Sequence, residues 1–257
     1  MYLIYILSGL CGGILIGLAG LTAAMVLTPI LSGVCGWAGY NAVTMSLVAN
    51  VPSAVVTAWT YYKNGNVDRK QGSAVSGSAF LGAVAGSYLG YLFSRVSENG
   101  VSYLVILGNL FMAVKFLRPA KKQQNLSAAQ TAVTRKKTVL ALILAFLIGA
   151  ECGFMGSAGG VMMLMVLTLV LGMNTKLAVG TGSLIMALVA LTGAVSHLMM
   201  GAVLEPLPAV IITLACTVGA VGSARFANRV NERVMNRCAG VILILISATS
   251  LLLSLKY

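Results

Sequence analysis

The chain has 257 residues, of which 59% are hydrophobic and 9% are charged. Soluble domains carry about 25% charged residues, so this chain lacks the polar residues needed to cover a water-exposed surface. Residues 1–62 contain no Lys, Arg, Asp or Glu, and the net charge of +12 comes from basic residues in short segments between apolar runs. This distribution is typical of an integral membrane protein and argues against nucleic acid as a partner.

Eight apolar segments follow one another along the chain. Six of them are close to the roughly 20 residues that cross the hydrocarbon core once as a helix. The first and fifth are longer, about 32 residues or nearly 50 Å as one straight helix, and both hold glycines near the middle. The segments are 3–34, 41–62, 73–94, 101–117, 139–171, 177–199, 207–224 and 235–255. They predict an all-α polytopic membrane protein.

The two halves of the sequence align without a gap when one is shifted by 136 residues. The aligned glycines are Gly13 with Gly149, Gly17 with Gly153, Gly20 with Gly156, Gly36 with Gly172 and Gly65 with Gly201. A fixed offset with matching segment boundaries favours a duplicated unit. The predicted parts are a first transmembrane repeat (1–117), a basic linker (118–138) and a second transmembrane repeat (139–257).

The basic residues predict how the segments cross the membrane. The linker 118–138 and the loops 63–72 and 225–234 are rich in Lys and Arg, which places them in the cytoplasm. The loop 95–100 has one base and one acid and faces out. Because 95–100 and 225–234 occupy equivalent places in the two halves, the repeats are predicted to be inverted. Each four-segment repeat then starts with a glycine-broken helix, and a re-entrant V and a full hairpin remain open for it.

The glycine breaks are the predicted binding site. Broken helices in inverted repeats are typical of a transporter's substrate site, and their N-termini offer N–H donors that suit an anion. Side-chain hydroxyls and an amide add further donors. The residues expected to bind the substrate are Gly17, Gly20, Thr22, Asn50, Gly156, Ser157, Gly159, Gly160, Thr181 and Ser183. The competing interpretation is close helix packing, for which small residues are also used in membranes.

Two ionisable residues fall inside predicted segments. Glu151 is the only acid in a predicted span, so it is the candidate for proton coupling; a neutral, hydrogen-bonded glutamate is the alternative. His197 is the only histidine and is expected at the membrane interface, with a proton relay as the alternative. The five cysteines show no CxxC or CxxH spacing, so no metal and no cofactor is predicted.

The sequence resembles the sulfite exporter TauE/SafE family, also called the TSUP family of membrane permeases. The resemblance rests on residues 17–31 (GLAGLTAAMVLTPIL), 153–172 (GFMGSAGGVMMLMVLTLVLG) and 178–203 (AVGTGSLIMALVALTGAVSHLMMGAV), and it extends over nearly the whole chain. The first copy departs from the family pattern, with Thr22, Ala23 and Ala24 where glycines are usual, so the two half-sites are expected to be unequal. Pro29 likewise has Met165 as its counterpart.

The resemblance implies a secondary transporter of small anions, such as sulfite, sulfonates or related organosulfur compounds and carboxylates, in the cell membrane. A neutral or cationic sulfur-containing solute is the second alternative, and an intramembrane enzyme is the third. No HExxH motif, paired acid or Walker motif is present, so neither an enzyme nor an ATP-driven pump is expected. The expected partners are the small anionic solute and the lipid bilayer, and a homo-oligomer remains open.

Overall fold

The computed structural model describes residues 1–96, 104, 135–156 and 159–227, and every regular element among them is a helix. The predicted all-α fold class is therefore confirmed for this part of the chain. The predicted segments 101–117 and 235–255 and most of the linker 118–138 lie outside the described residues. The elements are α1 (Tyr2–Ala19), α2 (Ala24–Gly33), α3 (Gly39–Lys63), α4 (Arg69–Val96), α6 (Arg135–Met155), α7 (Gly159–Met165), the π-helix η1 (Val166–Val170), α8 (Thr175–Met199) and α9 (Pro206–Ala227).

Several helices have the length and composition of membrane spans. Among the described residues, α3, α6, α8 and α9 are long and apolar enough to cross a membrane. The pieces α1, α2 and α7 with η1 are apolar but shorter. The helix α4 has 28 residues, or about 42 Å, and glycine and serine dilute its apolar character. The chain is thus a multi-pass membrane protein.

Each of the two long apolar segments contains a point where a helix ends at glycine. The helix α1 stops before Gly20, whose φ of 66° and ψ of 25° are left-handed, a conformation that glycine adopts without the clash of a Cβ atom. The next helix, α2, starts at Ala24. In the second half, α6 is followed by Gly156 with a φ of 71°, and α7 starts at Gly159.

The left-handed glycines repeat along the chain. Among the described residues, the glycines with positive φ form three pairs that are each 136 residues apart: Gly20 and Gly156, Gly36 and Gly172, Gly65 and Gly201. The hydrogen bonds around the first pair repeat as well. The Gly20 N–H donates to the Ile16 carbonyl at 2.9 Å, and the Gly156 N–H donates to the Cys152 carbonyl at 2.8 Å. The sequence offset therefore reappears in backbone conformation.

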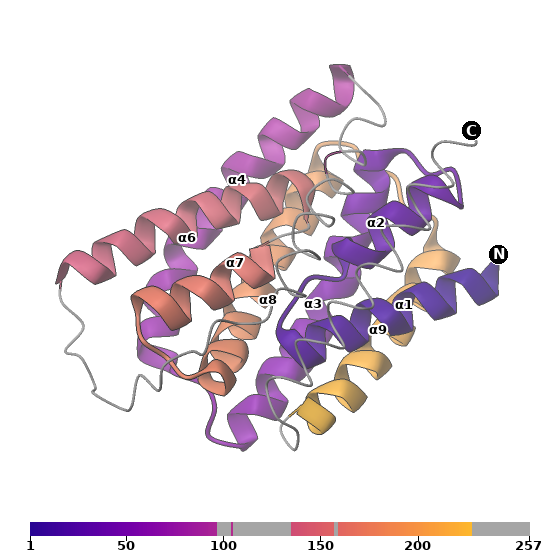
Figure 1. Cartoon of the computed structure of the whole chain (residues 1–257). Coiled ribbons are helices and arrows are strands. Elements are labelled where there is room, and N and C mark those ends of the chain that lie inside the picture. Colours follow the sequence, from indigo (N-terminus) through magenta and orange to yellow (C-terminus); the bar gives the residue numbers. More distant parts are fainter. Residues whose placement is uncertain (97–103, 105–134, 157–158, 228–257) are drawn as a thin grey trace.

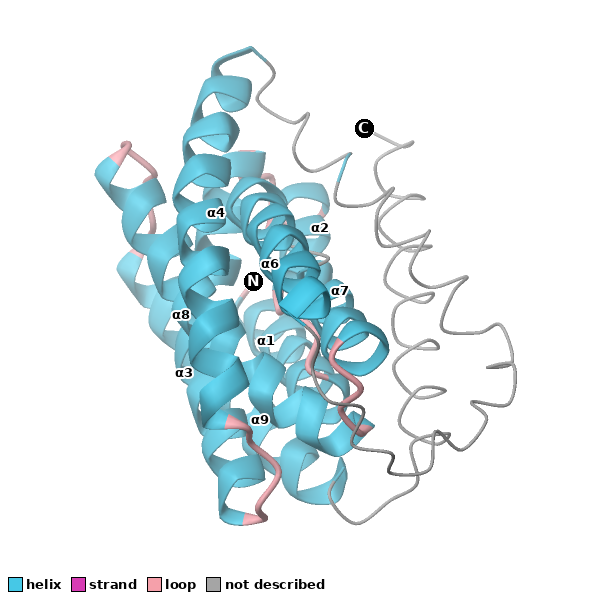
Figure 2. Ribbon diagram, turned by 90° about the vertical axis from the view of Figure 1, so that its left-hand side faces the viewer, coloured by secondary structure: helices cyan, strands magenta, loops and turns pink. Residues whose placement is uncertain are grey.

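The two long helices α3 and α8 pack against each other at the centre of the bundle (Figures 1 and 2). The pair α1 and α9 covers one side, and the pair α4 and α6 covers the other. The short helices α2 and α7 pack on α3 and α8, respectively. Elements from opposite halves of the chain are thus neighbours throughout, and most buried side chains lie between them.

Glycine brings the outer pairs into backbone contact. A Cβ on Gly13 would overlap the Cys216 carbonyl of α9, and a Cβ on Gly86 would overlap the Ala150 carbonyl of α6. Small residues at membrane helix interfaces permit this close approach, and packing then replaces the hydrophobic effect as the source of stability. These two seams hold α1 to α9 and α4 to α6.

Candidate functional site

The two glycine breaks meet in the buried interior. A Cβ on Gly160 would overlap the Gly20 carbonyl. A Cβ on Gly156 would lie 3.2 Å from the Val43 Cγ1, and one on Gly20 would lie 3.4 Å from the Val179 Cγ1. Since Val43 and Val179 are also 136 residues apart, each break packs on the long helix of the other half. The structure thus brings together three of the predicted site residues, Gly20, Gly156 and Gly160.

Gly17 faces away from this junction. A Cβ on Gly17 would overlap the Ser223 hydroxyl of α9 and lie 2.6 Å from the Ala224 backbone nitrogen. Its role in this conformation is the one that the competing interpretation gives to small residues, namely close packing of α1 on α9.

Asn50 binds the start of α2. Its Oδ1 accepts a hydrogen bond from the Ala23 N–H at 3.1 Å, and its side chain is 2% exposed. The sequence interpretation treats this helix start as a donor for an anion and Asn50 as a second donor. In the structure the amide oxygen satisfies the N–H instead, because a buried N–H without a partner costs free energy.

The equivalent place in the second half is apolar. Gly159 aligns with Ala23, and Met186 aligns with Asn50, at the offset of 136. A Cβ on Gly159 would lie 3.0 Å from the Met186 Cε. A polarisable thioether therefore covers the start of α7 where an amide oxygen caps the start of α2. The half-sites are unequal at this position in particular.

A row of polar side chains runs along one face of α3, which we call the α3 polar stripe. Its members recur every three or four residues, the spacing of one helix face, and each is at most 2% exposed. They are Ser46, Asn50, Ser53, Thr57 and Tyr61. Only Asn50 was predicted as a site residue. The signal that would have found the others is this helical periodicity of hydroxyl groups within an apolar segment.

The stripe touches three other helices. Ser46 Oγ lies 3.1 Å from the Thr28 hydroxyl of α2, and Ser53 Oγ lies 3.5 Å from the Thr217 hydroxyl of α9. The Thr57 hydroxyl is buried and has no hydrogen-bond partner among the described residues. A buried hydroxyl without a partner is costly, so the stripe contains one polar group that the protein itself does not satisfy.

The remaining predicted hydroxyls lie elsewhere on the bundle. The Thr181 Oγ1 accepts from the Asp68 N–H at 2.9 Å and so fixes the loop after α3 to the start of α8. The Ser183 hydroxyl donates to the Val179 carbonyl, one turn back in α8, at 2.8 Å. Thr22 is buried in the turn between α1 and α2. Ser157 lies outside the described residues.

Glu151 lies in the second-last turn of α6, and its Oε2 atom is buried. It precedes Cys152, which is fully buried and touches the position of a Cβ on Gly159. A carboxyl group at this depth fits the predicted coupling role and the neutral alternative equally well.

His197 is buried rather than interfacial, with 0% of its side chain exposed. Its Nε2 lies 2.8 Å from the Gly153 carbonyl, just before the break after α6. Tyr61, which aligns with His197, donates from its hydroxyl to the Gly17 carbonyl at 3.4 Å. Because Gly17 aligns with Gly153, both halves cap the same carbonyl with different side chains. The expectation failed since a histidine near a helix end can pack inward when another helix ends beside it.

Comparison with known proteins bears on what these helices do. The family model described as "Sulfite exporter TauE/SafE" matches residues 5–250. The chain is 26% identical over 217 residues to a Bacillus subtilis (strain 168) protein described as "Probable membrane transporter protein YunE", and the match covers 78% of this chain and 79% of that protein. No solved structure matches.

Proposed function

Since the chain belongs to the sulfite exporter TauE/SafE family of membrane transporters, we propose that it is a secondary transporter of small anions in the cell membrane. The substrates we propose are sulfite, sulfonates or related organosulfur compounds and carboxylates. A gradient supplies the energy, because the sequence has no Walker motif for ATP.

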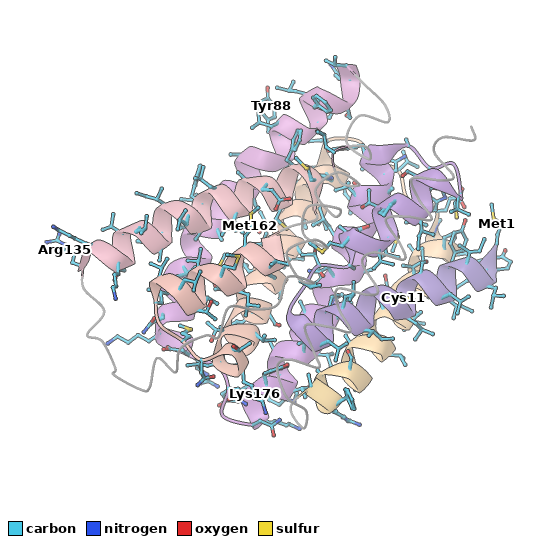
Figure 3. The ribbon with its side chains drawn as sticks, in the orientation of Figure 1. Met1, Cys11, Tyr88, Arg135, Met162 and Lys176 are labelled. Atoms are coloured by element: carbon cyan, nitrogen blue, oxygen red, sulfur yellow. The ribbon has the colours of Figure 1, made fainter. Side chains whose placement is uncertain are left out.

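The proposed architecture is two inverted repeats. The exchange of neighbours supports it: α1 packs on α9 as α6 packs on α4, and α1 aligns with α6 while α4 aligns with α9. Charge gives the sides. Lys63, Arg69 and Lys176 lie at the inner end, and Figure 3 places Lys176 and Arg135 far from Met1. The loop 200–205 is at the outer end, because the Val203 N–H donates to Asn41 Oδ1 at the start of α3, at 3.1 Å.

The proposed binding region lies where the breaks meet the α3 polar stripe. The observation that carries it is the buried Thr57 hydroxyl without a partner among the described residues, on the same helix face as Asn50 and Ser53. Neutral donors in a site of low polarity bind an oxyanion without a permanent positive charge. The breaks pack tightly in this conformation, so substrate access requires them to separate. Glu151 stays our candidate for proton coupling.

The test is uptake by proteoliposomes that contain the purified full-length chain. Labelled sulfite, sulfoacetate, taurine and acetate are offered at two internal pH values, and empty liposomes give the background. We expect saturable uptake of a sulfur oxyanion and competition by unlabelled anions of the same class. Uptake restricted to a neutral or cationic solute would remove the anion from the proposal but retain a transporter.

The binding region is tested by a matched pair of glycine variants. Gly156→Leu fills the space beside Ala24 and Val43, whereas Gly77 on α4 has no heavy atom within 4 Å of a Cβ. We expect Gly156→Leu to abolish uptake in a protein that still elutes as one species, and Gly77→Leu to transport normally. Full uptake by Gly156→Leu would exclude the break from the transport path.

A further inference from the structure

The surroundings of His197 accept two protonation states of its ring. The Gly153 carbonyl can only accept, so Nε2 carries a hydrogen and donates to it. The other nitrogen, Nδ1, lies 2.9 Å from the Thr44 Oγ1. In the neutral ring Nδ1 is an acceptor, so the Thr44 hydroxyl donates to it. Both ring nitrogens are then satisfied.

Addition of a proton leaves no polar group without a partner. The Thr44 Oγ1 also lies 2.7 Å from the Tyr40 carbonyl, one turn back in α3. When Nδ1 gains a proton it becomes a donor to Thr44, and the hydroxyl hydrogen turns to the Tyr40 carbonyl. A threonine hydroxyl can reverse in this way because it is both donor and acceptor. The site therefore holds histidine and its cation with the same heavy-atom positions.

Two features of the site favour the cation. The Gly153 carbonyl belongs to the last turn of α6, and the C-terminal end of a helix attracts positive charge. The Tyr40 ring stacks on the imidazole, with centroids 4.4 Å apart and planes at 17°, and an aromatic face attracts a cation. Charged residues do not supply either ring contact.

The titratable groups around His197 come from several packed elements. The helix α3 contributes Tyr40, and α6 contributes Glu151 and Cys152 just before Gly153. From α4, Tyr91 lies 6.4 Å from the Tyr40 ring, and Arg95 lies 4.8 Å above the Tyr91 ring. The elements α7 and η1 contribute none. Glu205 lies beyond the end of α8, in the loop to α9.

The first half shows that a cap alone does not need histidine. Tyr61 donates to the Gly17 carbonyl from the aligned position, but a tyrosine hydroxyl has no form that gains a proton near neutral pH. The residue aligned with Thr44 is Gly180, so the reversible hydroxyl is also missing there. Only the second half combines a basic ring with a partner that adapts to its charge.

We propose that His197 is a proton-binding residue that ties the movement of the break between α6 and α7 to the external pH. A charged donor makes a stronger hydrogen bond to the Gly153 carbonyl than a neutral one. Protonation from the outer side therefore holds the end of α6 against α8, and loss of the proton frees it. The link to transport rests on the proposed function, whereas the proton site itself does not.

The proton site is tested first, by NMR of the full-length chain in lipid nanodiscs. His197 is the only histidine, so a protein purified through a histidine-free tag gives one set of labelled imidazole signals. We expect these signals to titrate reversibly between about pH 5 and about pH 8, the window in which histidine changes charge. Thr44→Val keeps the side-chain shape but removes the reversible hydroxyl, and we expect it to lose the titration from this window. Unchanged signals across the window in the parent chain would overturn the proposal.

The link to movement is tested in proteoliposomes with the substrate that the parent chain transports. We expect uptake to slow as the external pH falls from about 8 to about 5.5. His197→Tyr copies the first half and keeps a donor for the Gly153 carbonyl, so we expect uptake without this pH dependence. Tyr61→Phe is the control and should retain the parent's profile. A pH profile that is the same in His197→Tyr and in the parent would overturn the link. If no solute is transported, the proposed function fails while the NMR titration still decides the proton site.

Discussion

The central helices of the two halves, α3 and α8, occupy equivalent places but carry different chemistry. The five positions of the α3 polar stripe are all polar, whereas the aligned positions of α8 are Gly182, Met186, Val189, Gly193 and His197. Both helices are built around the same left-handed glycines and the same capped carbonyl. The backbone of the repeat has been kept while its side chains have separated into a solute-facing half and a proton-responsive half.

The largest expected effect comes from the contact that joins the halves. Gly160→Val would force two methyl groups against the Gly20 carbonyl and Leu21, and overpacking of this kind costs about 3 kcal/mol. We expect a large loss of thermal stability, measured as the fraction of protein that elutes as one species after heating. Gly77→Val is the control on an open face of α4. Equal stability of the two variants would mean that the breaks are not packed as described.

The next effect separates the two caps. Asn50→Leu leaves the Ala23 N–H buried without a partner, at a cost of about 1–3 kcal/mol. Met186→Leu exchanges one apolar side chain for another and should cost less than about 1.5 kcal/mol. We expect Asn50→Leu to lower both the melting temperature and the uptake, and Met186→Leu to change little. Equal losses in the two variants would show that the difference between the half-sites has no functional weight.

A smaller effect of opposite sign is expected at Thr57. Thr57→Val removes a hydroxyl that has no partner among the described residues, so the free energy of unfolding should rise by about 1 kcal/mol. Uptake should fall by about tenfold if the hydroxyl binds the solute, the equivalent of about 1.4 kcal/mol. Thermal melting and initial uptake rates are measured on the same preparation. A more stable variant with unchanged uptake would separate the stripe from the solute.

The smallest effect is expected at the weaker of the two carbonyl caps. The hydrogen bond from Tyr61 to the Gly17 carbonyl is long, at 3.4 Å, so Tyr61→Phe should cost at most about 1 kcal/mol. His197→Phe removes a bond of 2.8 Å and the contact with Thr44, and it should cost more. Comparison of the two melting temperatures gives the order. A larger loss for Tyr61→Phe would reverse the assignment of the stronger cap.

Much of the fold was predictable because a membrane imposes segment length and because glycine is needed at left-handed positions. The offset of 136 aligned the glycines that later proved to have positive φ, for example Gly36 and Gly172. The residues at the breaks also followed from this pattern. The two segments outside the described residues remain predictions, as does the linker between the repeats.

The details of the site were not predictable, since they depend on which helix faces a given side chain. Thr181 was expected near the breaks but binds the loop before α4, because hydroxyls on one helix can face either end of the bundle. His197 was expected at the interface, yet the end of α6 gave it a buried partner. Contacts between positions 153 residues apart, such as Thr44 with His197, leave no local signal in the sequence.

The glycine seams also have a mechanical consequence. Where α1 meets α9 and α4 meets α6, backbone lies directly against backbone, so neither seam has side-chain rotamers that a sliding motion could exchange. The contact between α3 and α8 differs, because the Leu47 side chain covers Gly193 and can change rotamer. We therefore expect each outer pair to travel as one rigid body, with shear confined to the central contact.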